Sequence, residues 1–218
     1  MPGESTLSRA KDLKDKAKHD TENVTHDEVE ELLNILNGEY QEARTVAAGA
    51  FDQLYKRPEL FEPVAGKLLE FAAYYPRAQD GIPTPEEITI DNDLKEVVFI
   101  ADGLARVARR DPTMLTAVTD DLVTIMQSDR NYPKYHLITL GMVGAVDPNG
   151  VPMDEVTDQL CSLLDTYTHG YAGWAADTLR RIGDPGVLPK LNNQYPHSAS
   201  DATIEAFDDA IADLEKNR

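Results

Sequence analysis

The chain has 218 residues, of which 39 are Asp or Glu and 21 are Lys or Arg, so its formal net charge at pH 7 is −18. A chain of this length can bury roughly 70% of the surface that its unfolded form exposes, and the acidic excess disfavours a protein that coats nucleic acid. The single cysteine excludes an internal disulfide, no apolar stretch approaches the ~20 residues of a membrane span, and the N-terminus has no apolar signal-peptide core. This composition predicts a cytoplasmic protein with no membrane partner.

The acidic charge is spread along the chain. Residues 1–22 contain five acidic and five basic residues, so the whole excess belongs to residues 23–218. Salt screens repulsion between exposed charges, so acidity distributed over nearly every segment predicts a halophilic, acidic surface.

The first 22 residues form a charged N-terminal arm in this interpretation. Between Ser5 and Asp20 the apolar residues are only Leu7, Ala10, Leu13 and Ala17. Such a thin helical stripe would bury little by itself. We therefore expect residues 1–22 to be a mobile arm or to dock on a partner.

The remaining chain, residues 23–218, carries the apolar pattern of helices. Thr25 and Glu28 predict a capping box at the start of the first one, which Gly38 ends. Residues 76–91, with Gly81, Pro83 and Pro85, interrupt the pattern as an insertion. No segment shows sustained period-two alternation, so we expect an all-α fold. Apolar faces at helical spacing predict further helices over residues 43–54, 61–75, 94–108, 114–126, 135–146, 156–164, 171–182, 187–191 and 204–214.

Three Asp-Pro steps mark a repeat. They are Asp111-Pro112, Asp147-Pro148 and Asp184-Pro185, at intervals of 36 and 37 residues, and each separates two amphipathic segments. Arg57-Pro58 precedes Pro112 by 54 residues, and the excess matches the length of the insertion. A period near 37 with paired helices predicts an α-solenoid of about four to five stacked helical hairpins.

The segment from Trp174 to Pro189 resembles a HEAT-like repeat of the short variety first associated with bilin lyases. Small residues come first, then Leu179, Ile182-Gly183-Asp184 and Leu188-Pro189. The resemblance implies an α-solenoid that contacts proteins or nucleic acids and has no shared active site to carry over. The HEAT-repeat hydroxylase that modifies deoxyhypusine binds iron through His-Glu pairs, and no histidine of this chain is followed by Glu.

The candidate partner-binding residues are cations that precede the turns within the repeats: Lys56, Arg57, Arg106, Arg109, Arg110, Arg180 and Arg181. Stacked repeats would align them in a basic stripe that binds an acidic partner. Alternatively, they only stabilise the exposed carbonyls of helix C-termini, by roughly 0.3 to 1 kcal/mol each.

No catalytic, metal or cofactor constellation is visible. The five histidines are scattered without an i, i+4 pair, and Cys161 lies among leucines on a helix, as expected for a buried inert thiol. We therefore expect a non-catalytic, cofactor-free scaffold or adaptor for protein–protein interaction. The alternative is a nucleic-acid-associated repeat protein that uses the Arg pairs and the Lys-rich arm, although the net charge disfavours it.

Overall fold

The computed structural model describes residues 2–74, 92–128, 130–166 and 170–218. The described residues form eleven α-helices and several short 3-10 helices, with no β-strand among them, which confirms the expected all-α class. The expected insertion at 76–91 lies outside the described residues. The chain divides into two compact units, Met1–His136 and Leu137–Arg218, and the division falls inside helix α7.

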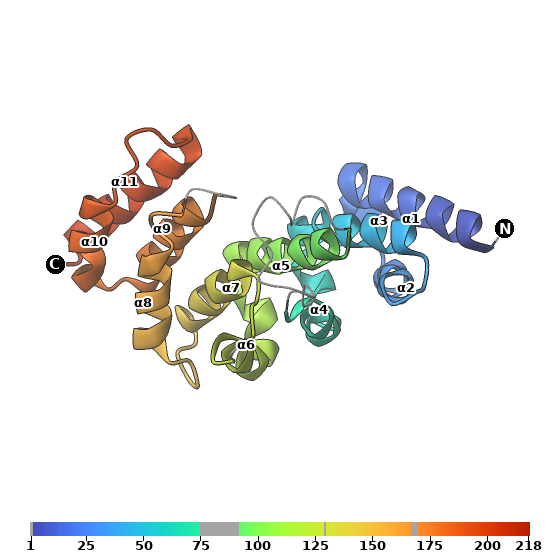
Figure 1. Ribbon diagram of the computed structural model, residues 1–218, viewed down its shortest axis with the longest axis horizontal. Coiled ribbons are helices and arrows are strands. Elements are labelled where there is room, and N and C mark those ends of the chain that lie inside the picture. Colours follow the sequence, from blue (N-terminus) through green and yellow to red (C-terminus); the bar gives the residue numbers. More distant parts are fainter. Residues whose placement is uncertain (1, 75–91, 129, 167–169) are drawn as a thin grey trace. The chain divides into compact units, whose positions relative to one another are not determined.

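The first unit consists of two layers of helices. Helices α1, α3 and α5 lie side by side, with α1 against α3 and α3 against α5, while α2 packs on α3 and α4 on α5 (Figure 1). The 3-10 helix η5 (Pro112–Val118) and α6 extend the second layer next to α4. The bounds are α1 (Pro2–His19), α2 (His26–Leu36), α3 (Gln41–Phe51), α4 (Ala65–Ala72), α5 (Asn92–Arg110) and α6 (Thr119–Met126).

The second unit is centred on α9. Helices α8 and α11 both pack against α9, and α10 packs against α11. Helix α11 buries Phe207, Ala210 and Leu214, whereas its Glu205 and Asp208 are exposed. The bounds are α7 (Lys134–Gly144), α8 (Met153–Ser162), α9 (Tyr171–Ile182), α10 (Leu188–Asn193) and α11 (Asp201–Lys216).

The capping box at the start of α2 is confirmed. The Oγ1 atom of Thr25 accepts a hydrogen bond from the backbone N–H of Glu28 at 3.3 Å, and the Glu28 carboxylate accepts one from the N–H of Thr25 at 3.0 Å. These bonds satisfy N–H groups that the first helical turn leaves without partners. The capping box therefore fixes where α2 begins.

The three Asp-Pro steps adopt the same local structure. In each, the aspartate Oδ1 accepts a hydrogen bond from the backbone N–H two residues later: from Thr113 to Asp111 at 3.1 Å, from Asn149 to Asp147 at 3.1 Å, and from Gly186 to Asp184 at 2.8 Å. Asp and Asn favour such turns because the side chain can bond the backbone two residues on, and proline pre-sets the φ angle that follows. Each corner follows the end of a helix; Asp111 and Asp184 directly precede the 3-10 helices η5 and η7 (Pro185–Val187), whereas α8 begins later than its corner, at Met153.

The corner at Arg57-Pro58 is built differently. The Arg57 side chain does not cap the following turn by accepting a backbone N–H; its Nη1 instead donates to the carbonyl oxygens of Thr21 at 3.3 Å and Glu22 at 2.8 Å. Those carbonyls belong to η1 (Thr21–Asn23), which links α1 to α2. Asp20, just before η1, lies 37 residues before Arg57, so the register of the corners extends back to the end of α1.

Residues 2–19 form helix α1, which packs within the first unit, whereas the sequence pattern suggested a separate arm over residues 1–22. Helix α1 packs along α3, and Ala10, Leu13 and Ala17 are at most 2% exposed. The stripe is thin because two of these three side chains are alanines, and small residues allow two helices to approach closely. The long-range partner, α3, could not be read from the local pattern.

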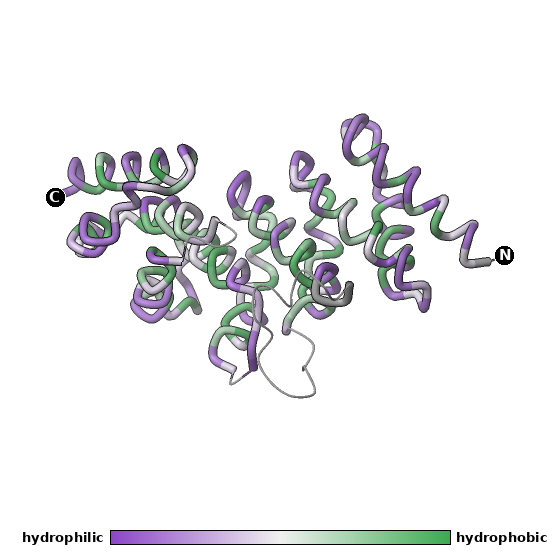
Figure 2. The backbone as a smooth tube through the Cα atoms, turned by 45° about the horizontal axis from the view of Figure 1, so that its top comes forward, coloured by the Kyte–Doolittle hydropathy of each residue, from purple (hydrophilic) through white to green (hydrophobic). Residues whose placement is uncertain are grey.

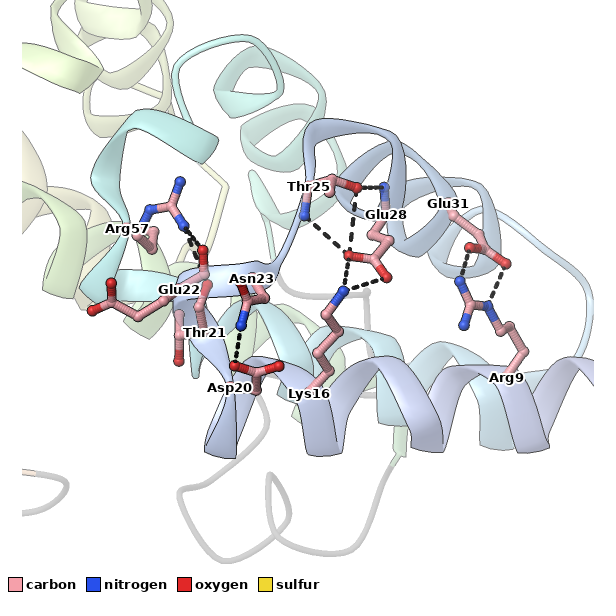
Figure 3. A network of polar contacts seen from close by, with 10 residues as sticks. All are labelled: Arg9, Lys16, Asp20, Thr21, Glu22, Asn23, Thr25, Glu28, Glu31 and Arg57. Atoms are coloured by element: carbon pink, nitrogen blue, oxygen red, sulfur yellow. Dashed lines mark hydrogen bonds and ion pairs between the residues drawn. The ribbon is translucent and has the colours of Figure 1, made fainter.

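Two ion pairs also join α1 to α2 (Figure 3). Both oxygens of Glu31 accept bonds from Arg9, at 2.9 and 2.7 Å, and both oxygens of Glu28 accept bonds from Lys16, at 2.8 Å each. The Arg9–Glu31 pair is exposed, so it stabilises the protein by only on the order of 0.2 to 1 kcal/mol. Burial of the apolar stripe contributes more than this.

The helices alternate apolar and polar positions along their length (Figure 2), and the apolar sides form the cores of the two units. Small residues mark close approaches, as expected: Ala47, Ala48, Ala175 and Ala176 are completely buried. No described helix is long and apolar enough to cross a membrane.

Gly141 in α7 marks a close approach to both α8 and α9. A Cβ atom at this position would lie 2.7 Å from Thr178 Cγ2 and 2.9 Å from Leu160 Cδ1. Thr178 cannot easily rotate away, because it is completely buried and its Oγ1 donates to the carbonyl of Trp174 at 2.8 Å.

We predict that Gly141→Ala destabilises the protein and that Gly66→Ala does not. Alanine gains about 1 kcal/mol over glycine in a helix, but overpacking at Gly141 costs about 1 to 3 kcal/mol, so the net change is a loss. At Gly66 in α4 a Cβ meets only Val118 Cγ1, at 4.0 Å, so the propensity gain remains. Urea unfolding of both variants measures the difference; equal stability of the two would contradict the close approach.

Candidate functional site

The predicted basic residues are divided between the two units. Five of them belong to the first unit: Lys56 and Arg57 lie at the end of η2 (Leu54–Lys56), and Arg106, Arg109 and Arg110 lie in the last two turns of α5, on which η2 packs. Lys56, Arg109 and Arg110 are exposed. Arg180 and Arg181 lie in the second unit, in the last turn of α9.

Arg57 holds two helical hairpins together (Figure 3). In addition to its bonds to the carbonyls of Thr21 and Glu22, its Nε forms an ion pair with Glu59. The pKa of Glu59 is lowered, mainly by this bond from Arg57. The guanidinium is therefore committed to the chain itself, which accounts for Arg57 without a partner.

Arg106 lies between two carboxylates. Its Nε is 2.8 Å from Asp102 Oδ2, one turn earlier on α5, and 3.1 Å from Asp52 Oδ1, at the end of α3. The guanidinium carbon is 5.5 Å from the ring centre of Tyr55, a cation–π distance. Arg106 therefore joins α3 to α5 and is also committed to internal contacts.

The positive charge of Arg106 does not fully offset the burial of Asp102 and its repulsion by Asp52. The pKa of Asp102 is raised from 3.8 to about 6. Burial is the largest cause and the neighbouring Asp52 adds to it, whereas Arg106 opposes the shift. A carboxyl that is harder to ionise in the folded than in the unfolded protein lowers stability as pH rises from about 4 to 6. Above that range the folded protein carries the full cost of the ionised, half-buried pair.

We predict that Asp102→Asn stabilises the protein at pH 7, because the amide carries no charge that burial and Asp52 disfavour. A pKa displacement of this size corresponds to at most about 3 kcal/mol. The gain should vanish below pH 4, where Asp102 is protonated in both states. Thermal or urea unfolding between pH 3.5 and 7.5 measures it, with the exposed Asp15→Asn as matched control; a gain independent of pH, or a loss at pH 7, would contradict the shifted titration.

The arginines of α9 are also paired. Arg180 contacts Asp177 through Nη2 at 2.7 Å and Asp213 of α11 through Nη1 at 3.2 Å, and Arg181 Nε is 3.5 Å from Asp177. Because α9 packs on α11, the bond to Asp213 links the two helices across their interface. Four of the seven predicted residues thus have internal structural roles, and a partner-binding role for Lys56, Arg109 and Arg110 stays a prediction.

Buried titratable residues do not assemble into a reactive site. His136 is 1% exposed; its Nε2 donates to the carbonyl of Ala72 at 2.7 Å, and burial lowers its pKa to about 4, so the ring is neutral at pH 7. Cys161 is buried, as expected, and burial raises its thiol pKa. Within the described ranges no three His, Cys, Asp or Glu residues gather as metal ligands would.

The first unit contains a groove between α4 and α6 that sequence reasoning missed. Its volume is about 510 Å³, within the range of about 300 to 1,000 Å³ that is typical of binding pockets. The groove, called here the α4/α6 groove, is lined by Gly66, Lys67, Leu69, Glu70, Ala73, Tyr74, Asp121, Thr124 and Ile125.

The floor and rim of the α4/α6 groove differ in character. Leu69 and Ile125 are buried residues that reach the floor, whereas Lys67, Glu70 and Asp121 are exposed at the rim. Beyond the lining, the guanidinium of Arg130 lies 3.6 Å from the ring centre of Tyr74, a cation–π contact that orients this ring. The groove therefore offers apolar contact below and charged contacts above.

The hollow depends on small residues. Gly66 presents no side chain, and almost nothing stands within 4 Å of the position its Cβ would take. Ala73 adds only a methyl group on the same side. A glycine in the middle of an otherwise apolar helical pattern was the available sequence signal, but only the position of α6 shows that the space beside it is open.

Comparison of the chain with protein-family models, curated proteins and solved structures gives no match. The resemblance to HEAT-like repeats therefore stays a prediction, and the case for a function depends on the geometry of the chain itself.

Proposed function

We propose that the chain is a non-catalytic helical-repeat scaffold that binds a segment of a partner protein in the α4/α6 groove. The observation that carries this proposal is the groove itself, with its apolar floor and charged rim. Apolar pockets with a few polar groups at the edge bind ligands by burial and orient them by the polar contacts. The described residues that line it include no histidine, cysteine or serine that could act as nucleophile or transfer a proton near neutral pH.

The scaffold is, in this proposal, a HEAT-like α-solenoid. The three Asp-Pro corners support it, because they share one hydrogen-bonding pattern and recur at nearly equal spacing. Arg57 supports it as well, since it links one corner to the turn 37 residues earlier. Helical hairpins of this size cannot bury their apolar faces alone, so stacking is the expected way to complete their cores.

The second candidate function, association with nucleic acid, is favoured by one feature of α1. This helix carries five Lys or Arg against three acidic residues, whereas neighbouring α2 carries four acidic residues and neither Lys nor Arg. Lys11, Lys14 and Lys18 have no side-chain partner within the described part of the chain. Phosphate contacts would make affinity fall steeply with salt, which distinguishes this candidate from an apolar groove.

We predict that filling the α4/α6 groove abolishes partner binding. A photo-reactive amino acid at Thr124 should cross-link a partner segment, and the partner, once identified and purified, should bind the intact chain directly. Gly66→Trp should then weaken the affinity at least about tenfold, because the indole occupies the floor that the partner needs.

The matched control is Ala202→Trp, which adds the same side chain at an exposed position of α11. It should leave the affinity unchanged. Cross-links that map away from the groove, or a purified partner that binds the Gly66→Trp variant as tightly as the parent chain, would contradict the proposal.

A further inference from the structure

We infer that the segment bound in the α4/α6 groove is a basic amphipathic helix, with apolar residues on one face and Lys or Arg beside them. This inference rests on the proposed function, because it specifies the occupant of the same groove. Three features of the groove carry it: helical walls, an apolar floor and carboxylates on both rims.

The walls favour a helical occupant over an extended one. An extended peptide gains its affinity largely from main-chain hydrogen bonds to a free strand edge. Here the walls are α4 and α6, whose main-chain groups bond within the helices, and no described residue forms a strand. A helix instead satisfies its own main chain and inserts side chains at positions i, i+3 or i+4 and i+7 into an apolar groove.

The rims favour a basic occupant. Glu70 on α4 and Asp121 on α6 are exposed on the two walls, and neither has a side-chain partner among the residues that the structure describes. Among the described residues of the lining, Lys67 is the one cation. A partner with Lys or Arg beside its apolar face would pair with both carboxylates, whereas an acidic partner would be repelled by them.

Glu70 has no evident local role. Asp120 and Asp121 lie in the first turn of α6, where a carboxylate stabilises the helix N-terminus. Glu70 lies in the last turn of α4, which contains no basic residue, and there a carboxylate is unfavourable by roughly 0.3 to 1 kcal/mol. A side chain that costs stability, points to solvent at the edge of a groove and lacks an internal partner is best explained by an external cation.

The test is a selection from a library of helical peptides that share one apolar face and carry random polar positions. Peptides are enriched on the intact chain and counter-selected on the Gly66→Trp variant, so that only groove-dependent sequences remain. We expect the enriched peptides to be rich in Lys and Arg. In the double variant Glu70→Lys/Asp121→Lys, the affinity of the best basic peptide should fall about tenfold or more, and repeated selection should yield acidic peptides.

The control is Glu205→Lys/Asp209→Lys on α11, which changes the net charge by the same amount at exposed positions of the second unit. It should preserve the basic preference, and circular dichroism should show that both double variants are folded. Groove-dependent peptides that are neutral or acidic would overturn the inference and leave the groove as a binding site. Absence of any groove-dependent peptide would overturn the proposed function and the inference with it.

Discussion

The corner between two helices is the constraint on which the rest of this structure depends. At Asp111, Asp147 and Asp184 a side-chain oxygen accepts the backbone N–H two residues later, and the proline between them prevents the preceding helix from continuing. Each corner therefore ends one helix and turns the chain toward the next. Neighbouring helices then pack their apolar faces together and form the buried cores of the two units.

Several arginines stabilise the fold through bonds to other parts of the chain. Arg57 stands where the other three corners have an aspartate. Its side chain bonds the carbonyls of η1, so this corner is held by a bond between successive hairpins and not by a local side-chain turn. Arg106 and Arg180 likewise join neighbouring helices through aspartates. In a chain with so large an acidic excess, internal carboxylates bind most of the available arginines. By contrast, Glu70 and Asp121 at the α4/α6 groove have no such neighbour in the part of the chain that the structure describes.

Local patterns were sufficient where the physical cause is local. The capping box of Thr25 and Glu28 and the three Asp-Pro corners depend on residues within three positions of each other, and all were predicted correctly. The role of α1 was missed, because Ala10, Leu13 and Ala17 become a core face only when α3 lies against them. Extending the 37-residue register from Arg57 back to Asp20 would have indicated a further helix there. The α4/α6 groove was missed for a related reason: it forms where small side chains of one helix face a second helix that is distant in the sequence.

The most direct test of this architecture is hydrogen exchange of the intact chain, resolved to the amides of α1. An isolated helix of this length is marginal in water, so an independent arm would exchange nearly as fast as an unfolded peptide. If α1 is the first helix of the array, its amides from Ala10 to Lys18 should open with a free energy close to that of α3, and Leu13→Ala should accelerate their exchange. Rapid exchange throughout α1 beside a well-protected α3 would contradict the hairpin register from which the fold and the groove are explained.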